Sequence, residues 1–392
     1  MDSLIYLAGR YVIHHWFKSV ILILCLTLSI FLPLAGRAVL KNLEDELQAR
    51  ANATPLVIGA KGSRFDLALH TLYFDVQPGE TIPYSVNRFV IESEFAWAIP
   101  IYSRHVSQNR IPIVGTSLGY FEFRQLRLEE GSLFSRIGQC VIGSDVAKSS
   151  QKGVGDFLLT TPETDVNIAG INPIKMQITG VLTANGTSDD QAIFTDLKTT
   201  WIIDGLGHGH QDIEEEDNPN LFLDKTDKMA TVNKGVVPYI EITDDNLGSF
   251  HFHGKLEDFP ITAVICDPNN EKAATRLEGR INTLEKLQIV APSSVIRNLM
   301  KKILQVKSLF DIATIAIFAV TTLFLVLNTL LSIRLRSREM MTMYKMGCGR
   351  FTIFGLYAWE YIIVLLASLL LALLLSMLLV GTLQQAVLEV VR

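Results

Sequence analysis

The sequence has 392 residues, a formal net charge of -5 and a mean hydropathy of +0.30. Hydrophobic residues make up 49% of the chain and concentrate in uninterrupted runs at its two ends, while the middle has the mixed composition of a soluble domain. This distribution is typical of a membrane protein. Because no basic face exists away from the apolar runs, a nucleic-acid partner is not expected.

The N-terminal region predicts a helix at the membrane surface followed by a first span. Residues 4–17 (LIYLAGRYVIHHWF) have an amphipathic pattern, which assigns residues 1–18 to a cytoplasmic or interfacial helix. Residues 19–36 carry no charge, and their length is close to the roughly 20 residues that cross a bilayer core. A cleaved signal peptide is the alternative interpretation. The long patterned start, and a helical pattern that continues over 38–51 as a stalk, favour a retained span.

The region from 37 to 308 predicts a large α+β domain with stalk helices. Strands are expected from short β-type runs between turn residues: TPLVIGAKGS, IPIVGTS, CVIGSDVA, DFLLTTP, KMQITGVLTANGT, YIEITDD and ITAVICD. Apolar residues at helical spacing predict a helix over 269–287. A further helix is expected to begin after Ser293 or Ser294 and to run without Gly or Pro to about Met346. Such a helix would be a rod joining the domain to the membrane.

The four cysteines do not form a metal-binding pattern. Cys25 lies in the first apolar run and Cys348 near the second, which leaves Cys140 and Cys266 in the middle of the chain without CxxC spacing. Two interpretations stay open. Cys140 and Cys266 form a disulfide if the domain faces an oxidising compartment, or they are two separately buried thiols.

Two more spans are predicted near the C-terminus, at 309–333 and 351–380. Uncharged residues run from 312 to 333 and from 361 to 388, and both runs are long enough to cross a bilayer. The basic, methionine-rich segment 334–350 (RLRSREMMTMYKMGCGR) lies between these spans, and a tail, 381–392, follows them.

The basic residues near the spans predict the orientation of the chain. Arg10 and Lys18 precede the first span, five basic residues lie in 334–350, and only Arg392 follows the last span. Because basic residues flanking spans favour the cytoplasmic side, the N-terminus and 334–350 are expected in the cytoplasm. The large domain and the C-terminal tail are then outside.

No catalytic motif is present. The sequence lacks GxxxxGK[ST], GxSxG and HExxH, so no enzyme is predicted. Two HxH pairs do stand out, namely His208 with His210 and His251 with His253. Four imidazoles suit a tetrahedral metal such as zinc. A solvated acidic loop beside an alternating strand is the alternative.

The C-terminal part resembles a known family. RLRSREMMTMYKMGCGRFTIFGLYAWEYIIVLLASLLLALLLSMLL is similar to the FtsX-like permease domain of the MacB/LolC/FtsX group of ABC transporters. Arg336, Glu339 and Gly347 match the basic segment of that family, and Glu360 matches a glutamate in the first turns of the next span. LVIGAKGS, EEGSLFSRIGQCVIGSDVA, VGDFLL and ITGVLTANGTSDDQAIFTDL resemble the periplasmic domain of the family, so the resemblance covers most of the chain. The family usually has four spans, whereas this sequence predicts three.

The resemblance implies a non-catalytic, multi-pass permease subunit of the mechanotransmission type in a bacterial inner membrane, with a periplasmic domain. Its implied partners are a cytoplasmic ABC ATPase dimer, which holds ATP and Mg²⁺, a second permease copy or paralogue, a periplasmic lipoprotein or adaptor, and membrane lipids. Segment 334–350 would be the coupling helix that docks the ATPase. The residues expected to serve this coupling are Arg336, Arg338, Glu339, Met340, Met343, Tyr344, Lys345 and Gly347.

Helical spacing divides that segment into two faces. Met340, Met343 and Tyr344 share one face, whereas Arg338 and Lys345 share another. Methionines suit an adaptable docking surface. The alternative is that the basic residues only enforce topology and bind lipid headgroups. Glu360, a charge within the membrane, is either functional or structural.

The expected function is to couple ATP hydrolysis by the partner to motion of the periplasmic domain. That motion would extrude or extract a periplasmic or outer-leaflet substrate such as a lipoprotein, a peptide or a hydrophobic compound. Two alternatives stay open: an FtsX-like signalling regulator of a periplasmic partner, and a metal-responsive membrane-anchored module.

Overall fold

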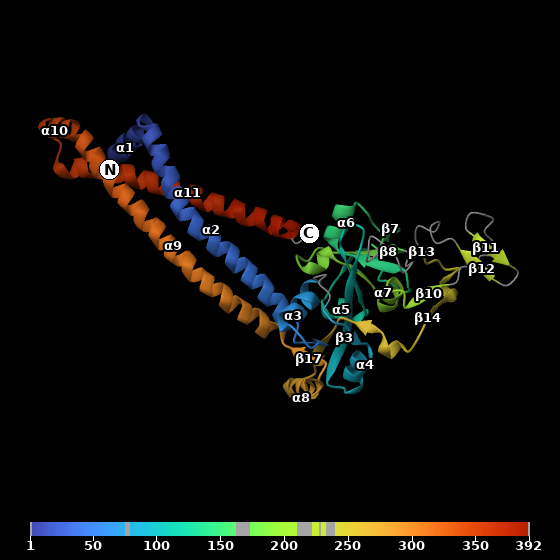
Figure 1. Ribbon diagram of the computed structural model, residues 1–392. Helices are drawn as coiled ribbons and strands as arrows, with labels where there is room; N and C mark the ends of the chain where they lie inside the picture. The colour runs from blue at the N-terminus through green and yellow to red at the C-terminus, as the bar shows by residue number, and fades with distance from the viewer. Residues whose placement is uncertain are drawn as a thin grey trace. The chain divides into compact units, whose positions relative to one another are not determined.

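The computed structural model describes residues 2–74, 79–161, 173–209, 222–226, 229–232 and 240–390. The chain divides into two compact units. The helical unit comprises Met1–Leu47 and Asn298–Arg392, and the α+β unit comprises Gln48–Arg297. The colours of Figure 1 show that the helical unit takes both ends of the chain, blue and red, while the α+β unit takes the middle.

The first unit is built from helices. They are α1 (Asp2–His14), α2 (Trp16–Asn52), α9 (Pro292–Leu335), α10 (Ser337–Lys345) and α11 (Arg350–Val390), of which α2 and α9 continue into the second unit. Helices α2, α9 and α11 are long and largely apolar. Within the described residues, three segments are long and apolar enough to span a membrane: Trp16–Val39, Asp311–Leu335 and Arg350–Leu379. This finding agrees with the three predicted spans. Most large apolar side chains of these segments are exposed in the isolated chain, as lipid-facing side chains are.

The first and second candidate spans run antiparallel. Three side-chain pairs join α2 to α9, namely Lys18–Ser332 at 2.9 Å, Ser29–Thr321 at 2.6 Å and Arg37–Asp311 at 3.0 Å. Because the residue number rises along α2 as it falls along α9, the two helices point in opposite directions. From Lys18 to Arg37, α2 rises by about 28 Å, close to the roughly 30 Å of a bilayer core.

The predicted rod differs from the observed helix at both ends. Helix α9 begins at Pro292 rather than after a serine cap, since proline has a fixed φ and no N–H to leave unbonded at a first helical position. It ends at Leu335, because Arg336 has φ -96° and ψ 6° and separates α9 from α10. The helix therefore stops about ten residues before the predicted end at Met346.

The α+β unit is built on a mixed sheet of eleven strands within the described residues. The main path of the sheet is β13 (Ile240–Glu241), β8 (Ile174–Leu182), β6 (Gln139–Ile142), β9 (Ile193–Asp196), β4 (Pro112–Thr116), β3 (Ala96–Val106), β16 (Ala263–Pro268), β1 (Leu56–Ala60) and β17 (Leu287–Val290). Strands β5 (Leu128–Gly131) and β7 (Phe157–Leu159) also pair with β8. The β4–β9, β6–β8 and β8–β13 pairs are parallel, whereas the other pairs are antiparallel.

Helices cover both faces of the sheet. They are α3 (Arg64–Tyr73), α4 (Ser85–Glu92), α5 (Gly119–Phe123), α6 (Ser144–Ser150), α7 (Leu197–Ile203) and α8 (Glu271–Asn282). Alternation along β1 shows the two faces, because Leu56 and Ile58 pack with apolar residues of α4, α7 and α8. Val57, between them, packs with residues of α3 and α5.

Short strand pairs lie outside the main sheet. They are β10 (Gly207–Gly209) with β14 (Phe250–Phe252), β11 (Phe222–Thr226) with β12 (Met229–Val232), and β2 (Ile82–Pro83) with β15 (Pro260–Ile261). All seven segments that were predicted as strands contribute residues to strands: β1, β4, β6, β7, β8, β13 and β16. Strand β3 was not predicted, and the helix expected over 269–287 ends at Asn282.

The two cysteines of the domain are not bonded. Cys140 lies in β6 and Cys266 in β16, and both are buried free thiols. Four strand spacings of ~4.8 Å separate β6 from β16 in the sheet, whereas the Cα atoms of a disulfide lie at most about 7 Å apart. The topology of the sheet therefore selects the interpretation of two separately buried thiols.

Candidate functional site

The segment between the second and third candidate spans forms the short helix α10 (Ser337–Lys345), which packs against α11. A left-handed glycine, Gly347 with φ +94°, lies in the turn that leads into α11. A residue with a Cβ is strained in this conformation, which accounts for a glycine at this predicted position. Residues 334–350 thus contain the end of α9, the helix α10 and the turn that leads into α11 (Figure 1).

Arg336, at the break between α9 and α10, points into the helical unit. Its side chain is 7% exposed, and Nη1 donates a hydrogen bond to Glu360 Oε2 of α11 at 3.0 Å. The guanidinium carbon lies 3.4 Å from the ring centroid of Tyr11 and 4.5 Å from that of Tyr357. Glu339 Oε2 lies 3.5 Å from Nε of Arg336. The Arg336 cluster (Arg336, Glu360, Tyr11, Tyr357 and Glu339) therefore links the start of α10 to α1 and α11.

The other predicted coupling residues lie on the surface of α10 to different extents. Arg338 and Lys345 are exposed, and Tyr344 is 51% exposed. Met340 and Met343 are half-buried. The polar face is therefore open to a partner, whereas the methionine face is partly covered within the helical unit.

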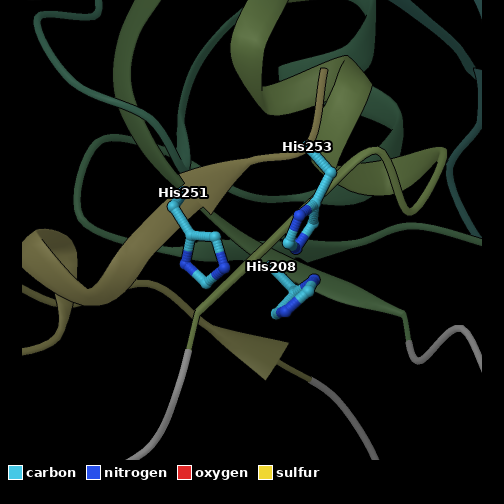
Figure 2. A group of neighbouring side chains, drawn as sticks. All are labelled: His208, His251 and His253. Atoms are coloured by element: carbon cyan, nitrogen blue, oxygen red, sulfur yellow. The ribbon is translucent and has the colours of Figure 1, made fainter.

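Three of the four predicted metal-ligating histidines come together in the α+β unit. His208 lies in β10 (Gly207–Gly209), His251 in β14 (Phe250–Phe252), and His253 directly after β14. One ring nitrogen from each lies within 4.8 Å of the others. Figure 2 shows the three rings side by side. His210 lies outside the described residues.

A buried charged cluster, which the sequence did not predict, joins the end of α2 to a 3₁₀ turn, η1 (Ser188–Gln191). Arg50 forms a bidentate ion pair with Asp189, with Nη1–Oδ2 and Nη2–Oδ1 distances of 2.9 Å each. Tyr120 of α5 donates to Asp189 Oδ1 at 2.6 Å, and Arg50 Nε donates to the Leu72 carbonyl. The Arg50 and Asp189 side chains are 6% and 1% exposed. The Arg50 cluster (Arg50, Asp189, Tyr120 and the Leu72 carbonyl) therefore locks the last turn of α2 into the domain.

The Arg50 cluster shifts the titration of its members in directions that follow from burial and charge. Burial alone raises the pKa of the Asp189 carboxyl, but the Arg50 guanidinium outweighs it and holds that pKa below its usual range. Burial, and then the Asp189 carboxylate, raise the pKa of Tyr120 well above its usual range. At neutral pH the cluster therefore holds an aspartate anion, an arginine cation and a neutral phenol.

Residues 20–236, more than half of the chain, match the family of the MacB-like periplasmic core domain. This chain belongs to that family. The MacB-like family supplies the non-catalytic permease component of ABC transporters and works with a cytoplasmic ABC ATPase. The expected family and the expected fold class, a membrane protein with a large α+β domain between the first two spans, are thus confirmed.

Solved structures of transporter and permease domains are also similar to this chain. The periplasmic region of MacB from Actinobacillus actinomycetemcomitans has 10% identity and a TM-score of 0.38, covering 64% of this chain and 95% of the other. The extracellular domain of the noncanonic ABC-type transporter YknZ from Gram-positive bacteria has 10% identity and a TM-score of 0.33, with coverages of 60% and 98%. A domain of a permease protein from Porphyromonas gingivalis has 11% identity and a TM-score of 0.26, with coverages of 60% and 86%. No curated protein matches.

The MacB-like match covers only part of the features described above. It contains the Arg50 cluster and His208, but it ends before β14 and α10. The roles of His251, His253 and the α10 residues are therefore matters for proposal. The signals for the Arg50 cluster were present in the sequence, as an arginine in the last turn of a predicted stalk helix and an Asp-Asp pair at 189–190.

Proposed function

We propose that this chain is the permease subunit of an inner-membrane ABC transporter in which α10 docks a separate cytoplasmic ATPase. The N-terminus and α10 face the cytoplasm, and the α+β unit is periplasmic. The basic residues beside the spans support this orientation, since Arg10 and Lys18 precede the first span and five basic residues lie in 334–350.

The single observation that carries the proposal is the combination of an open polar face on α10 with an internal anchor at its start. Arg338 and Lys345 are exposed, so they are available to an acidic surface of a partner. Arg336 holds the same segment against α11 and α1 through a buried ion pair and two aromatic rings. A displacement of α10 by a partner would thus be transmitted to the neighbouring helices, α1 and α11.

Coupling of this kind would move the periplasmic domain to extrude or extract a periplasmic or outer-leaflet substrate. ATP and Mg²⁺ would be held by the partner ATPase, and a second permease copy or paralogue would complete a dimer. The substrate class proposed is a lipoprotein, a peptide or a hydrophobic compound, with a periplasmic lipoprotein or adaptor as a further partner. The composition of the candidate spans supports movement of the substrate outside the membrane rather than through it. Their described side chains are mainly apolar and suit contact with lipid or another helix better than the lining of a polar channel.

Co-purification with the partner ATPase tests this proposal. The variant R338E/K345E reverses two exposed charges, and like charges facing each other at an interface cost several kcal/mol, so ATPase recovery should fall by about tenfold or more. The matched control K272E/R276E makes the same charge change on exposed positions of α8. The control should co-purify like the wild type. Wild-type recovery with R338E/K345E in a well-inserted protein would contradict docking at α10.

A further inference from the structure

The strand pair β10–β14 separates histidines from phenylalanines by face. His208 and His251 are directly opposite each other in the antiparallel pair, and His253 follows His251 by two residues, the spacing at which strand side chains share a face. At the alternate positions of β14, Phe250 and Phe252 pack against the buried core of the domain. The histidines therefore lie on the face away from the core, so packing of the core does not account for histidine at these positions.

The glycines of β10 fit the same arrangement. A Cβ added to Gly207 would lie 2.7 Å from the Phe252 ring, and one added to Gly209 would lie 2.7 Å from the Phe250 ring. Glycine at these two positions lets the phenyl rings pack closely over β10. The strand is consequently held in a register that places His208 beside His251.

The three imidazoles are close and partly oriented. Ring centroids are 4.7 Å apart for His208–His251, 4.8 Å for His208–His253 and 4.8 Å for His251–His253. His251 Nδ1 lies 3.2 Å from the Ser249 carbonyl. Since a carbonyl only accepts, this nitrogen must donate, and the neutral ring then carries its lone pair on Nε2. A ring N–H donated to a backbone carbonyl is the arrangement that orients metal-ligating histidines.

We propose that His208, His251 and His253 form a binding site for a borderline divalent cation of the zinc class. Imidazole nitrogens suit Zn²⁺, Cu²⁺ and Ni²⁺, and three protein ligands leave the fourth tetrahedral position for water or a further ligand. Ligand nitrogens at the usual Zn–N distance lie roughly 3.3 Å apart on a tetrahedral ion. The nitrogens here lie within 4.8 Å of one another, so side-chain rotations that close about 1.5 Å complete the site.

The exposure of the histidines makes this site accessible. His208 and His253 are exposed and His251 is half-buried. Figure 2 shows that the three rings converge from two segments of the chain. An ion would reach them without opening the domain. The site stands independently of the docking role proposed for α10, because its residues lie in the α+β unit alone.

A zinc titration of the full chain tests the site. The protein is purified in detergent without a histidine tag, and ZnCl₂ is titrated in competition with a chromophoric chelator. The wild type should bind one Zn²⁺ per chain at the site, and CoCl₂ should give the intense visible absorption of a tetrahedral cobalt–imidazole centre. Loss of one of three ligands should weaken binding by ~10-fold or more, so H208Q and H251Q should each do so.

The controls make each outcome decisive. H14Q removes an exposed histidine of α1 and should leave the high-affinity step unchanged. The triple variant H208Q/H251Q/H253Q should lose that step, and far-ultraviolet circular dichroism checks its fold. Because His208 is exposed, H208Q alone gives a valid test if the triple variant unfolds. The proposal is overturned if the wild type takes up no zinc against the chelator, or if H208Q and H251Q bind as tightly as the wild type.

Discussion

The Arg50 cluster allows a quantitative prediction about the stability of the α+β unit. The substitution Asp189→Asn keeps the size of the side chain and its contact with Tyr120 but removes the negative charge opposite Arg50. Both side chains of the pair are less than a tenth exposed, so water does not screen the arginine charge that remains. Breaking a buried pair by removing one partner costs about 3–5 kcal/mol, and we expect D189N to lose that amount.

Hydrogen exchange followed by mass spectrometry measures this loss in the full chain in nanodiscs. A free-energy loss of 3–5 kcal/mol corresponds to about a 150- to 5,000-fold faster exchange of the most protected amides of the sheet, at ~1.36 kcal/mol per factor of ten. The amides of β9 (Ile193–Asp196), which follow the η1 turn, are the first to compare. The candidate spans of α9 and α11 should exchange as in the wild type.

A fully apolar replacement is the matched control. R50M/Y120F/D189L removes the charges and the phenol hydroxyl together, and such replacements of buried pairs are often neutral or stabilising. We therefore expect this triple variant to be more stable than D189N, although it changes three residues rather than one. If D189N stays within about 0.5 kcal/mol of the wild type, or if the triple variant is the less stable of the two, the charge argument is wrong.

The pH dependence of D189N follows from the pKa of Asp189. Because the folded pKa lies below its usual value, the carboxylate contributes stability at pH values above the unfolded pKa of about 3.9. That contribution is lost only as the pH falls through the lower folded pKa. The difference between wild type and D189N should therefore stay constant from pH 8 to pH 5. A difference that disappears by pH 6 would refute the assignment.

Three further predictions concern the helical unit. A membrane-impermeant maleimide should label the wild type at Cys348, and only from the cytoplasmic side. Cys25 lies in the first candidate span, and Cys140 and Cys266 are buried, which raises the pKa of Cys140 to about 12. Labelling from outside would contradict the proposed orientation. Val306→Pro interrupts α9, at a cost of about 3 kcal/mol or more. ATP hydrolysis by the partner should stay intact while transport falls, and full transport would show that an unbroken α9 is not needed. Glu360→Gln removes the buried anion beside Arg336 and leaves only the exposed Glu339 carboxylate near it. Amide exchange in α10 should become about tenfold faster or more, whereas unchanged exchange would argue against the anchor.

The strands that the sequence predicts are short β-type runs bounded by turn residues. Strand β3 (Ala96–Val106) escaped prediction because its sequence, AWAIPIYSRHV, contains a proline and three polar residues in succession. Pro100 nevertheless lies in the ladder opposite Val264, and its carbonyl accepts a hydrogen bond from Thr116 Oγ1 at 2.9 Å. Proline usually marks an edge strand or the absence of a strand. Here the pairing of β3 with both neighbours outweighs that preference, and only the tertiary structure shows it.

The same limit applies to the helix expected over 269–287. Of the apolar residues at helical spacing in this segment, Ala273, Leu277 and Ile281 are buried. Leu284, by contrast, is 45% exposed, and Leu287 begins strand β17. A helical period in the sequence cannot distinguish a longer helix from a helix followed by a strand when the apolar residues of the strand continue the period. Pairing of β17 with β1 decides the boundary.

The α10 region shows why composition predicted the segment but not the role of each arginine. Arg336 and Arg338 stand two residues apart in the same basic segment, so topology rules treat them alike. The helix breaks at Arg336, which turns this side chain toward Glu360 and the Tyr11 ring, while Arg338 on α10 stays exposed. Tyr11 and Glu360 are hundreds of residues apart in sequence, and no local pattern reveals that both contact Arg336. Charge reversal at Arg338 should therefore act on partner binding, whereas a change at Arg336 should act on the helical unit itself.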